Sequence, residues 1–166
     1  MEIRIKKSII SGIVFTSILG TLSHFFYQWS GKNPLVALFS PVNESTWEHM
    51  KLIFFPMLLF SLFTSARMKE AAPSLPGALI LGNLAGTLSI PVLFYTYTGI
   101  IGENFLIADL AVFFAAVLIA WGTVWELRDS EKIFRCRFIL YGLAVIVCLL
   151  FFLFTFRVPG LPLFHA

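Results

Sequence analysis

The reactive side chains of this sequence gather in one short stretch, residues 40–51, which reads SPVNESTWEHMK. The stretch combines carboxylates, an imidazole, an amide, hydroxyls and an ammonium group, and it runs directly into the apolar segment LIFFPMLLF. Imidazoles and carboxylates are metal ligands and general acids or bases, and an ammonium group can hold an anionic ligand. The sequence therefore predicts a polar site at the mouth of a hydrophobic helix.

Helical spacing separates these groups onto different faces. Glu44, Glu48 and Lys51 follow one another at intervals of four and three residues, so the Lys51 ammonium can reach back to Glu48. Ser45 and His49 are four residues apart on a neighbouring face. A purely structural interpretation competes with a functional one, because acidic residues stabilise a helix N-terminus and a lysine can extend toward an acidic partner.

Two further candidate metal ligands come from other parts of the chain. His24 lies near the end of the first apolar segment, and Asp109 lies one to two turns into the fourth. At about 1.5 Å per residue, both should sit roughly 5 to 10 Å below the same membrane boundary as His49. Because an unpaired charge in the membrane costs about 2.5 to 3.5 kcal/mol, we expect these groups to share one partly hydrated pocket.

Two kinds of chemistry fit this set, and the sequence leaves open whether the protein is an enzyme. In the first, His24 and His49 bind a divalent metal such as zinc together with Asp109 or Glu44, and Glu48 acts as the general base. The zinc-protease patterns HExxH and HxxEH are absent from the sequence. In the second, the pocket binds a small polar or charged ligand or relays protons. The ligand-binding candidates are Asn43, Glu44, Trp47, Lys51 and Tyr95.

Composition indicates which fold must hold this site. Hydrophobic residues make up 58% of the 166 residues and charged residues 13%, which is roughly half the usual charge of a soluble domain. We expect one all-α domain, residues 1–166, that forms an integral membrane bundle with the lipid bilayer as its solvent. The transmembrane helices are expected at about residues 8–28, 41–66, 77–99, 104–126 and 134–156.

The start of the second helix carries two competing signals. Ser40 before Pro41 is typical of an N-cap followed by proline at the first helical position, and it gives the boundary used above. Ser45 and Glu48 form an alternative capping box. The apolar residues 35–39 are too few to cross a bilayer, so we expect them to lie in the interface or to cover the site.

Small residues predict how the helices pack. In a membrane, a stripe of small residues allows a neighbouring helix to approach closely. Gly82 and Gly86 form such a GxxxG pair in the third expected helix. In the first expected helix the stripe follows a four-residue spacing and ends in a histidine: Ser8, Gly12, Thr16, Gly20 and His24.

Lysine and arginine placement predicts the orientation of the bundle. On one side of the expected spans the basic residues are Arg4, Lys6, Lys7, Arg67, Lys69, Arg128, Lys132, Arg135 and Arg137. The other side has Lys32, Lys51 and Arg157. This asymmetry predicts a multi-pass protein of the cell membrane, with a cytoplasmic N-terminus, an external C-terminus and an outward-facing site. The net charge of +3 forms no basic groove, so nucleic acid is excluded as a partner, whereas a small polar ligand, a lipid or a second copy of the chain fits.

Two resemblances concern the polar stretch. The string SPVNESTWEHMK, continuing to the FP at residues 55–56, resembles the signature of a family of small bacterial integral membrane proteins of unknown function. That resemblance extends over nearly the whole chain, includes His24 and implies a membrane location without an activity. The Ser45 and His49 pair also resembles membrane hydrolases related to alkaline ceramidases, which makes Ser45 a candidate catalytic residue. Those hydrolases have seven spans and a later histidine pair that this chain lacks, so a metal-dependent hydrolase stays an alternative, as does a structural or partner-binding subunit.

Overall fold

The structure is a computed structural model that describes residues 2–68 and 72–165, which form helices joined by short loops. Lys69, one of the basic residues counted above, lies outside the described residues. Five of the described helices are long and apolar enough to cross a membrane, as predicted. The elements are α1 (Glu2–Trp29), α2 (Pro34–Ala37), α3 (Thr46–Met68), α4 (Leu75–Ile101), α5 (Leu106–Leu127), α6 (Glu131–Phe156) and the 3₁₀ turn η1 (Pro162–Phe164).

The second long helix begins later than the Ser40 and Pro41 signal predicted. It starts at Thr46, because the Ser45 Oγ accepts the Glu48 N–H at 3.4 Å and so caps the helix. The preceding residues form a loop in which the Asn43 side chain accepts the Ser45 N–H at 2.9 Å. The capping-box signal was therefore the correct one. The expected boundary at residue 41 was wrong by about one helical turn.

The other long helices lie where hydropathy placed them. Most of their ends are extended, whereas α5 begins two residues later than expected, at Leu106. Helix α1 begins at Glu2 rather than near residue 8, and the Glu2 carboxylate lies 2.9 Å from the Lys6 ammonium one turn later. Helix α4 ends at Ile101 and is followed by the C-cap residue Gly102, which adopts a φ of 91°. The charged first turn of α1 thus continues its apolar span as helix.

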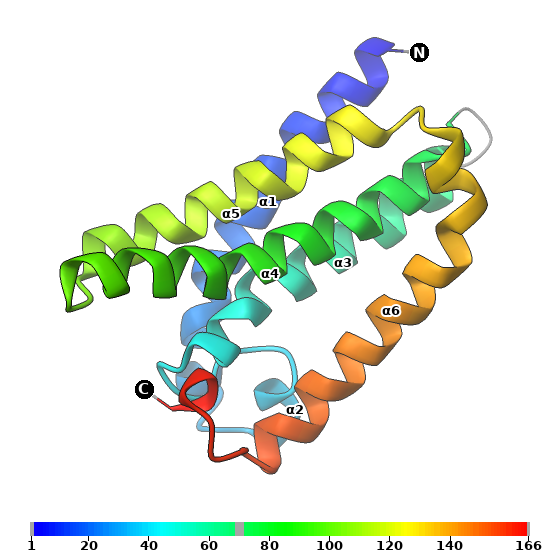
Figure 1. The fold of residues 1–166 in the computed structure, drawn as a ribbon. Helices are drawn as coiled ribbons and strands as arrows, with labels where there is room; N and C mark the ends of the chain where they lie inside the picture. Colours follow the sequence, from blue (N-terminus) through cyan, green and yellow to red (C-terminus); the bar gives the residue numbers. More distant parts are fainter. Residues whose placement is uncertain (1, 69–71, 166) are drawn as a thin grey trace.

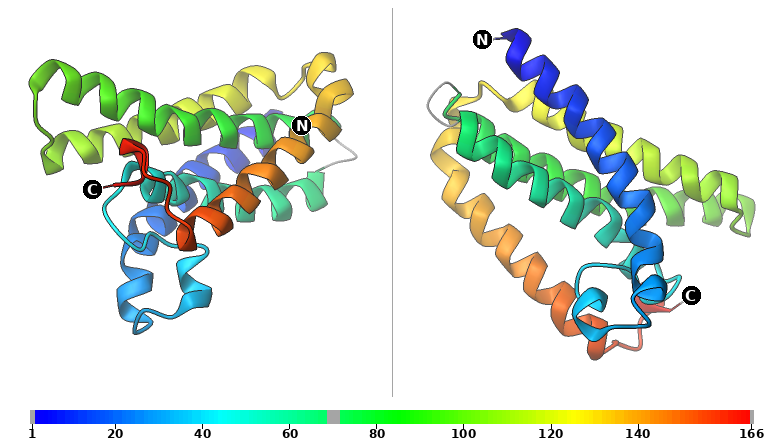
Figure 2. Two further views of the ribbon diagram at one scale, coloured as in Figure 1. Left: turned by 60° about the horizontal axis from the view of Figure 1, so that its bottom comes forward. Right: turned by 180° about the vertical axis from the view of Figure 1, so that it is seen from behind.

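Helix α4 lies at the centre of the bundle (Figure 1). It forms an antiparallel hairpin with α5 and packs along α3, while α1 crosses α3 and α5 from behind (Figure 1, Figure 2). Helix α6 packs against α4 near its start, and its far end reaches the beginning of α3. The N-terminus and the α5–α6 turn lie at one end of the bundle, and α2 lies toward the opposite end with the C-terminus (Figure 1).

The small-residue stripe of α1 is the close-packing face that the spacing predicted. A Cβ atom on Gly12 would lie 2.0 Å from the Trp121 ring of α5, and the Trp121 indole N–H donates to the Thr16 hydroxyl at 3.3 Å. A Cβ atom on Gly20 would lie 2.5 Å from the Leu52 carbonyl oxygen of α3. Glycine at these positions therefore allows α1 to press against both neighbours, one turn before His24.

The GxxxG pair of α4 packs against α5 in the same way. A Cβ atom on Gly82 would lie 2.5 Å from the Ala120 carbonyl oxygen, and one on Gly86 would lie 2.6 Å from the Ala120 Cβ. Between these glycines, the fully buried Asn83 donates its side-chain N–H to the Phe54 carbonyl of α3 at 3.0 Å. The centre of the bundle is thus fixed by close backbone packing and by a buried hydrogen bond.

Candidate functional site

Three candidate ligands from α1, from the loop before α3 and from α3 converge at one point. One ligand atom each from His24, Glu44 and His49 lies within 4.8 Å of the others. The His24 Nε2 is 3.6 Å from one carboxylate oxygen of Glu44, and the His49 Nε2 is 3.4 Å from the other. The two imidazole centroids are 5.3 Å apart. The predicted convergence of the two histidines is therefore present, with Glu44 between them.

The Glu44 carboxylate lies slightly beyond hydrogen-bond distance of both imidazoles. A hydrogen bond between a nitrogen and an oxygen is about 2.7 to 3.2 Å long, whereas the separations here are 3.4 and 3.6 Å, each to a different carboxylate oxygen. Two imidazoles and one carboxylate this close together could hold a metal ion.

A backbone contact orients the His49 ring. Its Nδ1 lies 2.9 Å from the Ser45 carbonyl oxygen, and because a carbonyl can only accept, Nδ1 is the donor. The Nε2 atom is then the ring nitrogen that faces Glu44. Metal-binding histidines commonly donate their second ring N–H to a carbonyl or carboxylate in this way, which fixes both the tautomer and the ring orientation.

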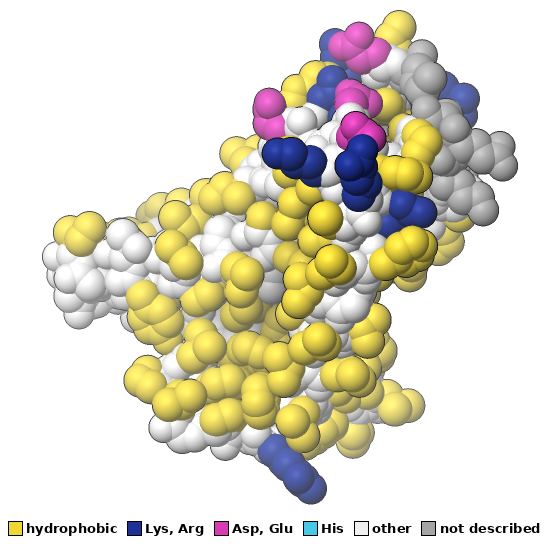
Figure 3. All heavy atoms as spheres, turned by 45° about the vertical axis from the view of Figure 1, so that its right-hand side comes forward, with side chains coloured by type: hydrophobic (Ala, Val, Ile, Leu, Met, Phe, Trp, Pro, Cys, Tyr) yellow, Lys and Arg dark blue, Asp and Glu magenta, His cyan; other side chains and the backbone are white. Residues whose placement is uncertain are grey.

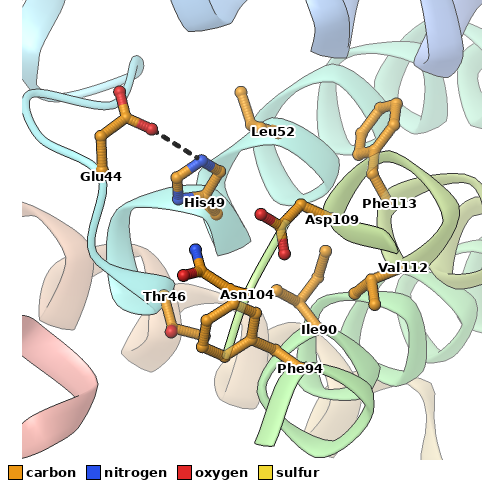
Figure 4. Close-up of a pocket in the computed structure, with 10 residues that line it drawn as sticks. All are labelled: Glu44, Thr46, His49, Leu52, Ile90, Phe94, Asn104, Asp109, Val112 and Phe113. Carbon is orange, nitrogen blue, oxygen red and sulfur yellow. Dashed lines mark ion pairs between the residues drawn. The ribbon is translucent and has the colours of Figure 1, made fainter. Parts of the chain in front are cut away.

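The site borders a cavity of about 210 Å³ between the start of α3, the C-terminal half of α4 and the N-terminal half of α5 (Figure 4). Glu44, from the loop before α3, and His49 of α3 line the cavity together with Asp109 of α5. In Figure 4 the Asp109 carboxylate lies between His49 and the apolar wall. Its remaining lining residues are Thr46, Leu52, Ile90, Phe94, Asn104, Val112 and Phe113.

Asp109 reaches this cavity but is not one of the three clustered ligands. Its carboxylate accepts a hydrogen bond from the Tyr97 hydroxyl of α4. Tyr95, which was predicted from the sequence to bind a ligand, is 42% exposed and does not line the cavity. Sequence reasoning also missed Asn104, although its place in the turn directly before Asp109 is a signal that could have identified it.

Glu48 and Lys51 form a second polar centre, which is separate from the cavity. The fully buried Lys51 ammonium donates to the Glu48 carboxylate at 2.7 Å, to the Ala37 carbonyl of α2 at 3.0 Å and to the Thr155 hydroxyl of α6 at 2.6 Å. The Glu48 carboxylate also accepts the Val42 N–H at 3.0 Å. Neither side chain lines the cavity. The predicted Glu48–Lys51 contact is therefore present, but it ties the loop to α2 and α6.

Trp47 and Ser45 also have contacts outside the cavity. The Trp47 ring packs 4.8 Å from Phe151 of α6 and 4.8 Å from Phe164 of η1, measured between ring centroids. Ser45 is 1% exposed, and its hydroxyl oxygen is the α3 cap described above. Asn43 is exposed and its side-chain oxygen shapes the loop. Of the predicted site residues, the structure thus places Glu44, His49 and Asp109 around the cavity, with His24 beside them.

Five candidate membrane-spanning helices indicate a multi-pass membrane protein. Over residues 1–166 the chain matches a family described as a family of unknown function (DUF6512), and it belongs to that family. The comparison with curated proteins and the comparison with solved structures each find no match. Membership of a family of unknown function was predicted from the SPVNESTWEHMK string, and it carries no activity with it.

Proposed function

We propose that this protein is an integral membrane protein that binds one divalent metal ion, zinc by ligand type, through His24, Glu44 and His49. The observation that supports the proposal is the meeting of their ligand atoms within 4.8 Å. Two imidazoles and a carboxylate are a ligand set typical of zinc sites that keep one position open for water or substrate. Calcium and magnesium prefer oxygen ligands, so two imidazoles argue against them.

The cavity supports an exchangeable position on the ion. Glu44 and His49 contribute both to the three-residue group and to the cavity wall. A divalent ion with neutral imidazoles and one carboxylate keeps a net positive charge, which the Asp109 carboxylate in the same cavity would balance. The proposed site therefore has an ion at Glu44 and His49, a counter-charge at Asp109 and apolar lining beyond it.

The distribution of basic residues supports an outward-facing site. Lys and Arg side chains gather at the end of the bundle that holds the N-terminus, above a wide hydrophobic band (Figure 3). Because basic residues are retained in the cytoplasm, we place the N-terminus inside the cell and the three ligands near the external surface. The ion would then exchange with the solution outside.

Metal analysis of the purified protein tests the proposal. After equilibration with trace zinc in detergent, the wild-type chain is expected to hold one zinc ion, and the double variant His24→Ala/His49→Ala is expected to hold none. The control is His165→Ala, which removes an exposed imidazole near the C-terminus. An impermeant chelator should strip the zinc from right-side-out vesicles and not from inverted ones. Zinc retained by the double variant, or the absence of any divalent transition metal from the wild type, would contradict the proposal.

A metal-dependent hydrolase is the second candidate function, and the position of Asp109 favours it. A zinc ion lowers the pKa of a bound water to about 7, and a positioned general base contributes about 10² to 10⁴-fold to the rate. Glu48, the base predicted from sequence, is held by Lys51 and by the Val42 N–H outside the cavity. Asp109 lines the cavity, and its carboxylate accepts a hydrogen bond from Tyr97. Asp109 therefore replaces Glu48 as the candidate general base.

The hydrolase candidate predicts a zinc-dependent rate that depends on Asp109. With chromogenic acyl ester, amide and phosphate ester probes, Asp109→Asn is expected to lower the turnover of a reactive probe by about 100-fold or more while the zinc content is unchanged. Asp129→Asn is the matched control, because Asp129 lies in the α5–α6 turn at the opposite end of the bundle. Zinc-loaded protein that turns over no probe, or an Asp109→Asn variant with the wild-type rate, rejects this candidate.

A further inference from the structure

A second cavity lies on the other side of the bundle, between α3, α4 and α6. It is a groove of about 380 Å³ with an almost entirely apolar lining that includes Leu62, Ile80, Ala144, Val145 and Cys148. Its lining comes from three helices that are each long and apolar enough to span the membrane. The groove exists because α6 contacts α4 near its start and α3 only near its far end.

One end of this groove continues into a hollow with a basic residue. Ser65, Pro76 and Tyr141 line both the groove and the hollow, and Arg137 lines the hollow. Arg137 lies in the second turn of α6, which begins at the end of the bundle where lysine and arginine gather (Figure 1, Figure 3). The apolar groove therefore ends beside two hydroxyl groups and the Arg137 guanidinium group, at the end of the bundle that is rich in basic residues.

The Arg137 side chain is held in place at this boundary. Its guanidinium carbon lies 4.0 Å from the Phe134 ring centroid and 4.5 Å from that of Phe138, and one N–H donates to the Phe134 carbonyl at 2.6 Å. A guanidinium group has five N–H donors, so further donors can bind a phosphate. Cation–π contact with two rings orients the group before any ligand binds.

We propose that the groove and the hollow together bind one anionic phospholipid, with an acyl chain in the groove and the phosphate at Arg137. Arg137 and Leu149, at the two ends of the combined site, are separated along α6 by about 18 Å at 1.5 Å per residue. This length is close to the hydrocarbon thickness of one leaflet, about 15 Å. An anionic lipid fills the apolar groove and also brings an anion to Arg137, so it satisfies both ends of the site.

Lipid binding to the delipidated full chain in a neutral detergent, followed by native mass spectrometry, tests the proposal. The probes are phosphatidylglycerol and phosphatidylcholine with the same acyl chains. One arginine near an anionic headgroup contributes about 1 kcal/mol, so the wild type is expected to prefer phosphatidylglycerol about fivefold. Arg137→Gln should remove this preference. Arg135→Gln is the matched control, because Arg135 is exposed and pairs with Glu131.

Two further experiments test the groove itself. One fills it with a larger side chain, and the other measures how fast a cysteine in its lining is alkylated. Val145→Trp, at a groove residue that is 58% exposed and so tolerates a larger side chain, should weaken both lipids. In the wild type, phosphatidylglycerol should slow alkylation of Cys148, with the exposed Cys136 as internal reference and inorganic phosphate without effect. Equal losses in Arg137→Gln and Arg135→Gln, unchanged binding in Val145→Trp, or no protection of Cys148 would each overturn the proposal.

Discussion

The His49→Ala variant is expected to bind zinc at least about 100-fold more weakly than the wild-type protein. Structural zinc sites with four ligands have apparent binding free energies of about 10 to 16 kcal/mol, so one ligand contributes about 3 kcal/mol, and each 1.4 kcal/mol is a factor of ten. Removal of the imidazole leaves one histidine and one carboxylate. A titration in competition with a chromophoric chelator, in detergent, measures the two dissociation constants.

A neighbouring substitution provides the matched control for His49→Ala. Ser45→Ala removes the hydroxyl group that caps α3 but keeps the carbonyl that accepts the His49 Nδ1–H. We therefore expect Ser45→Ala to lower stability by about 1 kcal/mol through loss of the cap, with zinc affinity close to the wild-type value. If His49→Ala and the wild type bind zinc equally, His49 is not a ligand.

The Lys51→Met variant is expected to lose about 3 to 5 kcal/mol in free energy of unfolding. Lys51 is fully buried and Glu48 is 2% exposed, so removal of the ammonium leaves a buried carboxylate without its counter-charge. The hydrogen bonds to Ala37 and Thr155 disappear with it. Unfolding by titration with a denaturing detergent in mixed micelles measures the loss.

Two further variants show whether the loss comes from the buried charge. The double variant Glu48→Gln/Lys51→Met removes both charges and should recover a large part of the lost stability, because a buried pair can often be replaced by neutral groups at little cost. Lys6→Met removes the same type of charge from the exposed Glu2–Lys6 pair and should change stability little. A Lys51→Met variant as stable as Lys6→Met would show that the buried pair contributes nothing.

The sequence predicted the helices well because hydropathy and length determine which segments can cross a membrane. It also predicted that His24 and His49 meet, since both were expected at the same depth. In the structure Gly20, one turn before His24, brings α1 against α3. Hydropathy, length, depth in the membrane and residue spacing are properties of each helix by itself. They do not depend on which helices are neighbours.

The side-chain directions within the motif were not predictable in this way. The assumption that Glu44 and Glu48 share a helix face failed, because Glu44 precedes the first residue of α3. Glu48 and His49 differ by about 100° around the helix. The positions of α4 and α5 on one side of α3, and of α2 and α6 on the other, decide which of the two faces the cavity. The same limit explains why Tyr95 was selected although it is Tyr97 that contacts Asp109.

The buried lysine also constrains how the protein is made. The Lys51 ammonium and the Thr155 hydroxyl that binds it are separated by 104 positions in the chain, and Thr155 lies in the last turns of α6. The ribosome must therefore synthesise α6 before this cation has all its partners. We expect α1 to α5 to stay loosely associated during synthesis, and to settle into their final arrangement only when α6 inserts.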